Sequence, residues 1–318
     1  MKLQCAILDD YQQVALDMAD WSAISDRVDV KVFSQHIASK DELAQTLESF
    51  DIIVIMRERT PFRASLLARL PKLKLLVTTG MRNASIDLAA AAASGVVVSG
   101  TNGVPAHTAE LTWALMLGLA RNIVQEHQAV RGGGWQSTLG TDLYGKTLGV
   151  LGLGKLGGRV AQIGQAFGMK VQAWSQNLTQ ERADELGVRR TSSKQELLAS
   201  SDFVSIHLVL SDRTRGLIGA EALKLMRPTA YLINTSRAAI VDRDALAEAL
   251  QNGWIAGAGL DVYPLEPLPE DDLFRSLPNV LTTPHLGYVT KDNYAVFYRD
   301  AVEDIQAFLA GAPVRTLG

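Results

Sequence analysis

Three side chains late in the chain have the chemistry to transfer a proton to a substrate that carries a carboxylate. Arg237 lies in the segment INTSR, Glu266 in VYPLEP and His285 in LTTPHLG. An arginine can hold a carboxylate through charge-assisted hydrogen bonds. A glutamate can orient a histidine and favour its charged form, and an imidazolium can donate a proton to a carbonyl oxygen. Beside a bound dinucleotide, these groups would be suited to reducing a 2-keto acid by hydride transfer.

A candidate dinucleotide site is the segment GLGKLG at residues 152–157, which fits the pattern G-x-G-x-x-G. It follows an apolar run typical of a strand and opens a run typical of a helix, the context that this pattern requires. Gly152 would allow the tight turn, Gly154 the approach of the backbone to the pyrophosphate, and Gly157 the close packing of helix on strand. The helix N-terminus would then face the phosphates. We therefore expect NAD(P)(H) as the cofactor.

The end of the next predicted strand bears on which dinucleotide is used. An Asp or Glu there usually binds the ribose 2′-hydroxyl of NAD, but Ser175 occupies the position, and WSQNLT at 174–179 contains no carboxylate. Ser175, Asn177 and Thr179 could donate hydrogen bonds to a 2′-phosphate, and Arg182 follows a turn later. The sequence leans toward NADP(H) over strict NAD specificity, with a loop that accepts either cofactor as the alternative.

The composition is that of an ordinary globular protein and excludes several classes. The 318 residues are 47% hydrophobic and 20% charged, with a net charge of −3, so we expect no general affinity for nucleic acid or for an anionic membrane. Cys5 is the only cysteine, which fits a reducing compartment. The longest strongly apolar run, residues 111–120, is too short to span a bilayer, and the N-terminus lacks the apolar core of a signal peptide. We expect a cytoplasmic protein.

Short β-branched segments alternate with helical patterns along the chain, which predicts parallel sheets covered by helices on both faces. The candidate strands are residues 4–9, 29–33, 51–56, 73–78 and 95–100, followed by 146–154, 170–174, 203–208, 230–235, 256–261 and 279–283. Helical patterns lie near 12–19, 40–49, 62–70 and 86–94. A long one spans about 107–130 before the glycine cluster RGGGW, and the last spans roughly 291–310.

The break in this rhythm near residue 101 predicts two α/β domains, each a doubly wound parallel sheet. Residues 101–287 form the NAD(P)-binding Rossmann domain. We expect this domain to be inserted in a flavodoxin-like domain made of residues 1–100 and 288–318, because the last helical pattern can return to the first domain. The role of that domain in binding substrate is what the family resemblance described next implies.

Five motifs in order resemble those of the D-isomer-specific 2-hydroxyacid dehydrogenase family. GLGKLG matches its cofactor loop, and HLVLSDRTRGLI at 207–218 is similar to its H-x-P-L-T-x-x-T-x-x-x-I, with Val209 in the proline position. INTSRAAIVD at 233–242 is similar to its N-T-A-R-G-x-x-V-D. GLDVYPLEPLP at 259–269 and LTTPHLGYVT at 281–290 match its last two signatures. The resemblance covers almost the whole chain.

The resemblance implies a hydride transfer between NAD(P)H and C2 of a small 2-keto or D-2-hydroxy acid, with Arg237, Glu266 and His285 as the catalytic residues and His285 as the acid/base. It implies that residues along the Rossmann motifs contact the cofactor. These are Gly152, Gly154, Lys155, Leu156, Gly157, Ser175, His207, Thr214, Thr235, Ser236, Asp261 and Gly287.

The resemblance also implies substrate-binding residues in the first domain. LVTTGMRNASID at 76–87 is similar to the family's R-A-G-V-G-x-D-N-I-D, where backbone N–H groups meet the substrate carboxylate; the residues here are Met81 and Arg82. Arg57 occupies a position that often faces substrate. The family usually has glycine in place of Arg82, a departure that could add a cation to the pocket and puts the close backbone approach in doubt.

Relatives of this kind include glyoxylate/hydroxypyruvate reductases and phosphoglycerate dehydrogenases. We favour the former type, because no regulatory domain follows residue 318 in this sequence. Formate dehydrogenases place Gln at the position of Glu266. A second reading is an NAD(P)-sensing binding module of the corepressor type without significant turnover; the absence of a disordered tail in the sequence counts against it. The scattered histidines give no metal site. The segment 107–145 resembles the family's dimerisation element, so we expect a homodimer.

Overall fold

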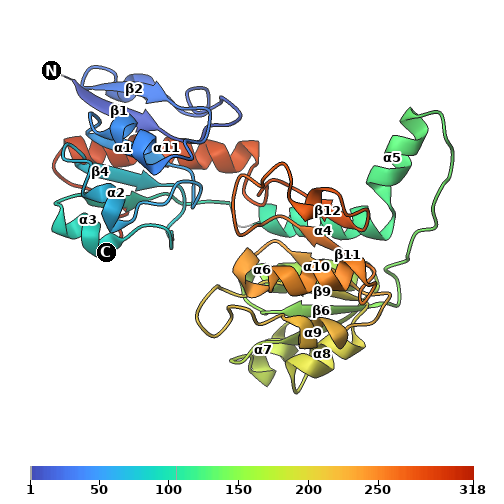
Figure 1. The fold of residues 1–318 in the computed structure, drawn as a ribbon. Coiled ribbons are helices and arrows are strands. Elements are labelled where there is room, and N and C mark those ends of the chain that lie inside the picture. The colour runs from blue at the N-terminus through green and yellow to red at the C-terminus, as the bar shows by residue number, and fades with distance from the viewer. Residues whose placement is uncertain (1, 105) are drawn as a thin grey trace. The chain divides into compact units, whose positions relative to one another are not determined.

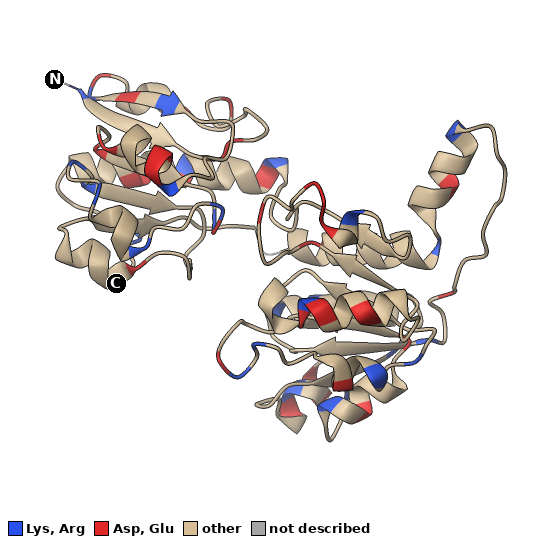
Figure 2. Ribbon diagram, in the orientation of Figure 1, with Lys and Arg blue, Asp and Glu red and all other residues tan. Residues whose placement is uncertain are grey.

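The computed structural model describes residues 2–104 and 106–318, and the chain divides into two compact units (Figure 1). The first unit comprises residues 1–104 and 289–318, and the second unit comprises residues 105–288. Each unit is built on its own parallel sheet with helices packed against it. Acidic and basic residues are interspersed over both units (Figure 2). Among the described residues, every helix is too short or too polar to traverse a lipid bilayer.

The sheet of the first unit has five parallel strands in the order β2-β1-β3-β4-β5. This is the flavodoxin-like order, in which the strand order reverses between β1 and β3. The strands are β1 (Leu3–Ile7), β2 (Val28–Val32), β3 (Ile52–Ile55), β4 (Leu75–Thr78) and β5 (Val97–Gly100). The helices are η1 (Trp21–Ile24), α1 (Lys40–Leu47), α2 (Ala64–Leu67), α3 (Leu88–Ala93) and α11 (Lys291–Leu309).

The sheet of the second unit has seven parallel strands in the order β12-β11-β10-β9-β6-β7-β8. It contains the Rossmann order, with the reversal between β6 and β9. The strands are β6 (Thr147–Leu151), β7 (Lys170–Trp174), β8 (Arg189–Arg190), β9 (Phe203–Ile206), β10 (Tyr231–Asn234), β11 (Gly257–Leu260) and β12 (Val280–Thr282). The helices are α4 (His107–Ala120), α5 (Ile123–Arg131), α6 (Lys155–Ala166), α7 (Gln180–Glu185), α8 (Lys194–Ser200), α9 (Ala220–Lys224), α10 (Arg243–Gln251), η2 (Ala238–Ile240) and η3 (Leu273–Arg275). The predicted fold class is confirmed.

The second unit buries an apolar cluster on each face of its sheet. One cluster packs α4 and α6 against the sheet and includes Trp113 and Val150. The other packs α8, α9 and α10 against the opposite face and includes Leu151 and Leu223. Neighbouring residues of one strand enter different clusters because successive side chains point to opposite faces. This double cover explains why the strands read as continuous apolar runs.

Two sequence-based expectations are wrong in detail, and one strand was not predicted. The predicted helix at 12–19 is a series of turns, because the Asp10 carboxylate accepts hydrogen bonds from Val14 N (3.2 Å) and Ala15 N (2.9 Å). The predicted helix at 107–130 is two helices, α4 and α5, separated by Asn122 in the left-handed conformation (φ 50°), which asparagine tolerates better than most residues. Strand β8 was not predicted, because only two residues pair.

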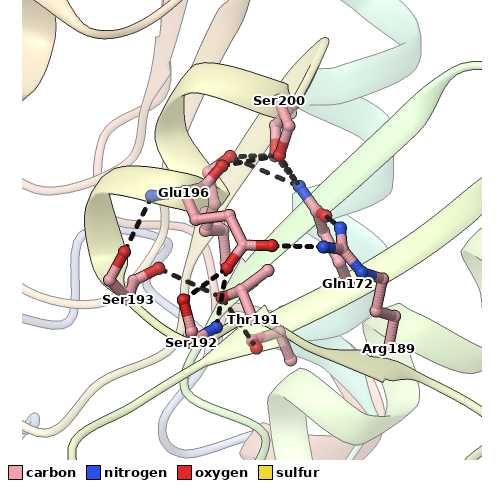
Figure 3. Close-up of polar contacts among 10 residues, drawn as sticks. Gln172, Arg189, Thr191, Ser192, Ser193, Glu196 and Ser200 are labelled. Atoms are coloured by element: carbon pink, nitrogen blue, oxygen red, sulfur yellow. Dashed lines mark hydrogen bonds and ion pairs between the residues drawn. The ribbon is translucent and has the colours of Figure 1, made fainter.

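A polar cluster surrounds the short edge strand β8 (Figure 3). Gln172, buried in β7, donates from Nε2 to Ser200 Oγ (2.7 Å) and accepts at Oε1 from Arg189 Nη1 (2.8 Å). Arg189 also pairs with Glu196, which accepts hydrogen bonds from the backbone and hydroxyl of Ser192 (2.8 and 2.7 Å). These bonds lower the pKa of Glu196. The cluster ties β8 to α8 and gives this edge of the sheet a charged, polar border, which discourages pairing with other chains.

The C-terminal segment closes the first unit. Leu317 N donates to Val98 O (2.8 Å), and Gly100 N donates to Arg315 O (2.9 Å), so the segment pairs with β5. The Arg315 guanidinium bonds to Asp304 Oδ1 (3.0 Å) and to Glu303 (3.0 Å) on α11. Asp304 is fully buried, and its other oxygen has no hydrogen-bond partner among the described residues.

Burial raises the pKa of Asp304 to about 7, against the lowering effect of Arg315 and together with the like charges of Asp300 and Glu303. The folded state therefore binds this proton more tightly than the unfolded state. The free energy of unfolding should fall as the pH rises from about 4 to about 7, and the contribution stays lost above that range. Asp304→Asn should lack this part of the fall. The free energy of unfolding of the variant minus that of the wild type, measured by urea unfolding, should therefore be more favourable to the variant at pH 8 than at pH 5. An equal difference at both pH values would contradict this.

Candidate active site

The carboxyl ends of six strands of the second unit are aligned by their register. Across the sheet, each strand pairs with its neighbour at its last residue, in the order Trp174, Leu151, Ile206, Asn234, Leu260 and Thr282. The residues that follow them form a row along one edge: Ser175, Gly152, His207, Thr235, Asp261 and Thr283. Five of these six residues were predicted to contact the cofactor. Ligands of doubly wound sheets bind outside this edge, where the strand order reverses, and here Gly152 and His207 flank the reversal.

The three glycines of the loop after β6 have different constraints. Gly152 has φ 98°, and a Cβ there would lie 2.7 Å from the carbonyl oxygen of His207. A Cβ at Gly157 would lie 2.0 Å from the carbonyl oxygen of Gly152, so helix α6 can approach β6 only without a side chain at this position. A Cβ at Gly154, by contrast, would meet nothing within 4 Å. The space beside Gly154 therefore suits a pyrophosphate.

Helix α6 begins inside this loop. Gly154 is its N-cap residue, and Lys155 and Leu156 are the first residues of the helix. The first intrahelical bond at this end is donated by Gly158 N to Gly154 O (2.8 Å). The preceding N–H groups lie at the positive end of the helix dipole and are free of intrahelical acceptors, which favours a phosphate group there.

Glu266 and His285 are in direct contact. Glu266 Oε2 lies 2.6 Å from His285 Nδ1, and Glu266 Oε1 accepts a hydrogen bond from Tyr263 N (2.9 Å). Both side chains are partly exposed, at 26% and 18% respectively. A carboxylate at Nδ1 selects the tautomer that carries a proton there and leaves Nε2 to exchange a proton with a substrate. Among the residues described, Nε2 has no hydrogen-bond partner.

The segment that carries His285 is held by the buried carboxylate of Asp261. Its Oδ1 accepts hydrogen bonds from Thr283 Oγ1 (2.7 Å) and Leu286 N (2.7 Å), and its Oδ2 accepts one from Gly287 N (2.9 Å). Burial raises the pKa of Asp261, and these bonds together with His285 oppose that shift. The segment turns sharply between these bonds, with His285 at φ 54°. Asp261 therefore fixes the backbone on either side of His285.

Helix α4 holds the same segment from the other side. Thr108 Oγ1 donates to Gly287 O (2.8 Å), and His107 Nδ1 contacts the same oxygen. Tyr263 supports the strand end through hydrogen bonds of its hydroxyl with Leu260 O (2.9 Å) and Thr283 O (3.0 Å). Three residues of this arrangement were not predicted from the sequence: Thr108, Tyr263 and Thr283. Thr283 and Tyr263 lie inside the quoted motifs, beside His285 and Glu266, and Thr108 has no comparable sequence signal.

Arg237 follows β10, the strand next to β11, and is half-buried. Its Nη1 donates to Ser236 O (2.8 Å), and its carbonyl oxygen accepts from Asn234 Nδ2 (3.1 Å). The turn is fixed further by Ser236, whose hydroxyl donates to Leu208 O (2.6 Å). Arg237 therefore lies at the same edge of the sheet as Glu266 and His285, beyond the carboxyl ends of the strands.

His207 and Thr214 belong to the loop after β9. Burial lowers the pKa of His207 to about 4, so its ring is neutral at neutral pH. His207 Nε2 contacts Ser205 Oγ (2.8 Å), while Nδ1 has no partner among the described residues. Thr214 Oγ1 donates to Val209 O (2.8 Å) and accepts from Ser211 N (2.8 Å), which stabilises the loop.

Beyond β7, Ser175 is partly exposed and precedes a turn in which Leu178 N donates to Ser175 O (3.1 Å). Arg182 on α7 reaches back to the glycine loop, where its Nε donates to Leu153 O (3.3 Å). Its Nη1 also pairs with the exposed Glu185 (2.8 Å). A cation therefore lies beside the loop even though none is adjacent to Ser175 in sequence.

The predicted substrate residues lie in the first unit, after β3 and β4. Arg57 has φ 52°, and its Nη1 donates to Thr79 O (3.2 Å). A Cβ at Gly80 would lie 1.8 Å from that Nη1, so glycine is required for the guanidinium to occupy this place. Met81 is 42% exposed, and Arg82 is exposed as well. Within residues 2–104 and 106–318, no group of three His, Cys, Asp or Glu could hold a metal ion.

Comparisons with known proteins agree on one family. Residues 113–287 match the model of the D-isomer specific 2-hydroxyacid dehydrogenase NAD binding domain. The chain is 39% identical over 300 residues to the glyoxylate reductase of Aeropyrum pernix, with 91% of this chain and 89% of the relative covered. It is 36% identical over 288 residues to the D-3-phosphoglycerate dehydrogenase of Bacillus subtilis, with 90% of this chain but 54% of that relative covered. The solved structure of a phosphoglycerate oxidoreductase from Vibrio cholerae is 39% identical, with a TM-score of 0.93 and with 98% of this chain and 100% of that one covered.

The glycine loop gives a matched pair of variants. Gly154→Ala should fold with a near-normal melting temperature, because its Cβ meets no atom, but it should bind NADH and NADPH more weakly because the methyl group occupies space needed by the pyrophosphate. Gly157→Ala should lower the melting temperature, because its Cβ collides with backbone. Thermal unfolding and fluorescence titration with each cofactor measure both effects. Wild-type cofactor affinity in Gly154→Ala would contradict the assigned position of the pyrophosphate.

Proposed function

The chain belongs to the D-isomer specific 2-hydroxyacid dehydrogenase family, and from this premise we propose that His285 is its acid/base, paired with Glu266. The chain is an oxidoreductase that acts with a nicotinamide cofactor on a small 2-keto or 2-hydroxy acid. The observation that carries the proposal is the 2.6 Å contact between His285 Nδ1 and Glu266. The alternative of a sensing module is not favoured, because the named relatives are reductases and dehydrogenases.

The residues at the carboxyl edge fit a dinucleotide. The open space at Gly154 and the first turn of α6 suit the pyrophosphate, and the row from Ser175 to Asp261 would line the remainder of the cofactor. The cofactor, when bound, supplies or accepts the hydride at C2 of the substrate. We propose that the residues of this row contact the cofactor as expected from the sequence. Asp261 acts at least through the segment that it holds, because its carboxylate bonds to Thr283, Leu286 and Gly287.

Different side chains donate the proton and bind the carboxylate of the substrate. In the reduction direction, protonated His285 donates from Nε2 to the ketone oxygen, while Glu266 keeps Nδ1 protonated and the ring oriented. Arg237 binds the carboxylate or the carbonyl oxygen through charge-assisted hydrogen bonds. Oxidation reverses these roles. We assign substrate binding to the first unit, through Arg57 and the backbone at Met81 and Arg82, and cofactor binding to the second unit.

The cofactor preference that we propose is NADP(H). The residue after β7 is Ser175, so no carboxylate repels a 2′-phosphate at this position. The Arg182 guanidinium lies beside the glycine loop and adds a positive charge there. Its ion pair with Glu185, which is 62% exposed, is weak enough in water to open for a phosphate.

The substrate that we propose is of the glyoxylate or hydroxypyruvate type. The chain is 39% identical to the glyoxylate reductase of Aeropyrum pernix and 36% identical to the phosphoglycerate dehydrogenase of Bacillus subtilis. A small keto acid requires one carboxylate clamp. Arg82 stands where the family usually has glycine and offers a further cation to a substrate with a second polar group.

We also propose a cytoplasmic homodimer, built on α5 and the segment that follows it. This part extends from the second unit (Figure 1), and α5 has no buried residue. Large apolar side chains are exposed along it: Ile123, Val124, Val130, Trp135, Leu139 and Tyr144. An apolar surface of this kind is typical of an interface.

Turnover tests the proposed reaction. Oxidation of NADPH and NADH, followed by absorbance, should occur with at least one of glyoxylate, hydroxypyruvate, pyruvate and phosphohydroxypyruvate, and should have the lower KM for NADPH. His285→Ala should lower kcat by about 10²–10⁴-fold, because the proton donor is lost. Glu266→Gln should cause a smaller loss, because an amide can still orient the ring.

Two controls separate the possible failures. His127→Ala, at an exposed histidine of α5, should keep wild-type turnover, and fluorescence titration should show that His285→Ala still binds cofactor. Near-normal turnover of His285→Ala would overturn the role of this residue. No turnover with any of the four keto acids, despite confirmed cofactor binding, would contradict the proposed substrate class.

The dimer predicts a mass in solution of twice the chain's 34.4 kDa at micromolar concentration. Replacing two exposed apolar residues, Trp135→Ser with Leu139→Asp, should shift the mass measured by light scattering to that of one chain. Leu16→Asp, at an exposed leucine of the first unit, serves as the control and should remain dimeric. A wild-type mass of 34.4 kDa would contradict the proposal.

A further inference from the structure

A buried polar network lies at the carboxyl edge of the first unit's sheet, where the strand order reverses between β1 and β3. Its centre is Asp9, which follows β1, is 1% exposed and has φ 58°. Asp9 Oδ2 accepts a hydrogen bond from Thr60 Oγ1 (2.6 Å), and Oδ1 lies 3.0 Å from His36 Nδ1. A buried carboxylate needs such partners, because an unpaired one is costly.

The network reaches the segment after β3 at a second point. Arg59 Nη1 donates to the carbonyl oxygen of Asp9 (2.6 Å), and its Nη2 donates to Tyr294 Oη (3.4 Å) on α11. The Arg59 guanidinium also lies over the ring of Tyr11, 4.4 Å from its centroid. Arg59 and Thr60 are thus both bonded to Asp9.

The same segment is held from β4 at its other end. Arg57 N donates to Thr79 Oγ1 (2.9 Å), and Asn83 Nδ2 donates to Arg57 O (2.7 Å). Arg57 therefore stands between two anchors, Thr79 on the β4 side and Asp9 on the β1 side. Its left-handed backbone, at φ 52°, is a conformation that persists in a non-glycine residue when surrounding contacts enforce it.

Edges of this kind commonly bind a ligand at the strand reversal. In the first unit, the residues that follow β1 and β3 bond instead to one another, and Thr60 is 2% exposed. The hydrogen bonds of Asp9 therefore hold the segment 57–60 in place. Arg57 is the residue of that segment for which we propose a substrate contact.

We propose that Asp9 and Thr60 are positioning residues that fix the place at which Arg57 meets the substrate. The proposal rests on the substrate role given to Arg57 above. Removing the Thr60 hydroxyl leaves one oxygen of the buried Asp9 carboxylate without its partner. The segment 57–60 then relaxes, and the charge-assisted hydrogen bond from Arg57 to the substrate weakens when the guanidinium is displaced.

The test compares Thr60→Val, which keeps the side-chain shape, with Thr60→Ser, which keeps the hydroxyl. With the most active keto acid of the panel, Thr60→Val should raise the KM for the keto acid by about tenfold, with kcat changed by less than about twofold and an unchanged KM for the cofactor. Thr60→Ser should remain within about twofold of the wild type.

A double-mutant cycle with Arg57→Ala identifies the path of the effect. If Thr60 acts through Arg57, Thr60→Val should cause no further rise in KM in the Arg57→Ala background. An undiminished effect in that background, or a wild-type KM in Thr60→Val, would overturn the positioning role while leaving the role of Arg57 intact. A wild-type KM in Arg57→Ala would contradict the substrate role itself.

Thermal unfolding of each variant confirms that it is folded. If Thr60→Val does not fold, His36→Ala provides the same test from the partly exposed side of the network, where the histidine side chain is 18% exposed. It should raise the KM for the keto acid, and this rise should also vanish in the Arg57→Ala background. A rise that persists there would overturn the proposal.

Discussion

The buried carboxylate of Asp261 is the constraint on which the proposed active site depends. A carboxylate that is 0% exposed requires hydrogen-bond donors, and it takes them from Thr283, Leu286 and Gly287. These three donors enclose His285, so satisfying Asp261 also sets the backbone of His285. The ring then meets Glu266 at 2.6 Å. The proposed proton donor is thus placed by a group that need not touch the substrate.

The two units use the same type of sheet edge in different ways. In the second unit, the strand reversal lies beside Gly154, where the loop leaves open space and a helix N-terminus. In the first unit, the reversal is occupied by bonds among Asp9, Thr60 and Arg59. One edge is therefore suited to receiving a dinucleotide, while the other is suited to holding a segment. Both arrangements arise because parallel strands bring the residues that follow them to one side of the sheet.

The sequence predicted the fold class and the backbone constraints at two glycines of the loop after β6, since periodicity and a fixed motif report these directly. The structure confirms the constraints at Gly152 and Gly157. The assignment of one domain to the substrate and the other to the cofactor stays a prediction. The break at Asn122 could not be predicted, because apolar periodicity continues on both sides of one left-handed residue. The Asp9 network was also not predicted. Its partners His36 and Thr60 lie 27 and 51 positions from Asp9 in the sequence, and no motif links them.

The most direct test of the central account is a crystal structure of the protein with NADPH and oxamate, an unreactive analogue of a 2-keto acid. The account predicts that His285 Nε2 lies within hydrogen-bonding distance of the oxamate carbonyl oxygen, about 2.6–3.2 Å, with Glu266 still bonded to Nδ1. A structure in which another side chain donates to that oxygen while His285 remains distant would contradict it.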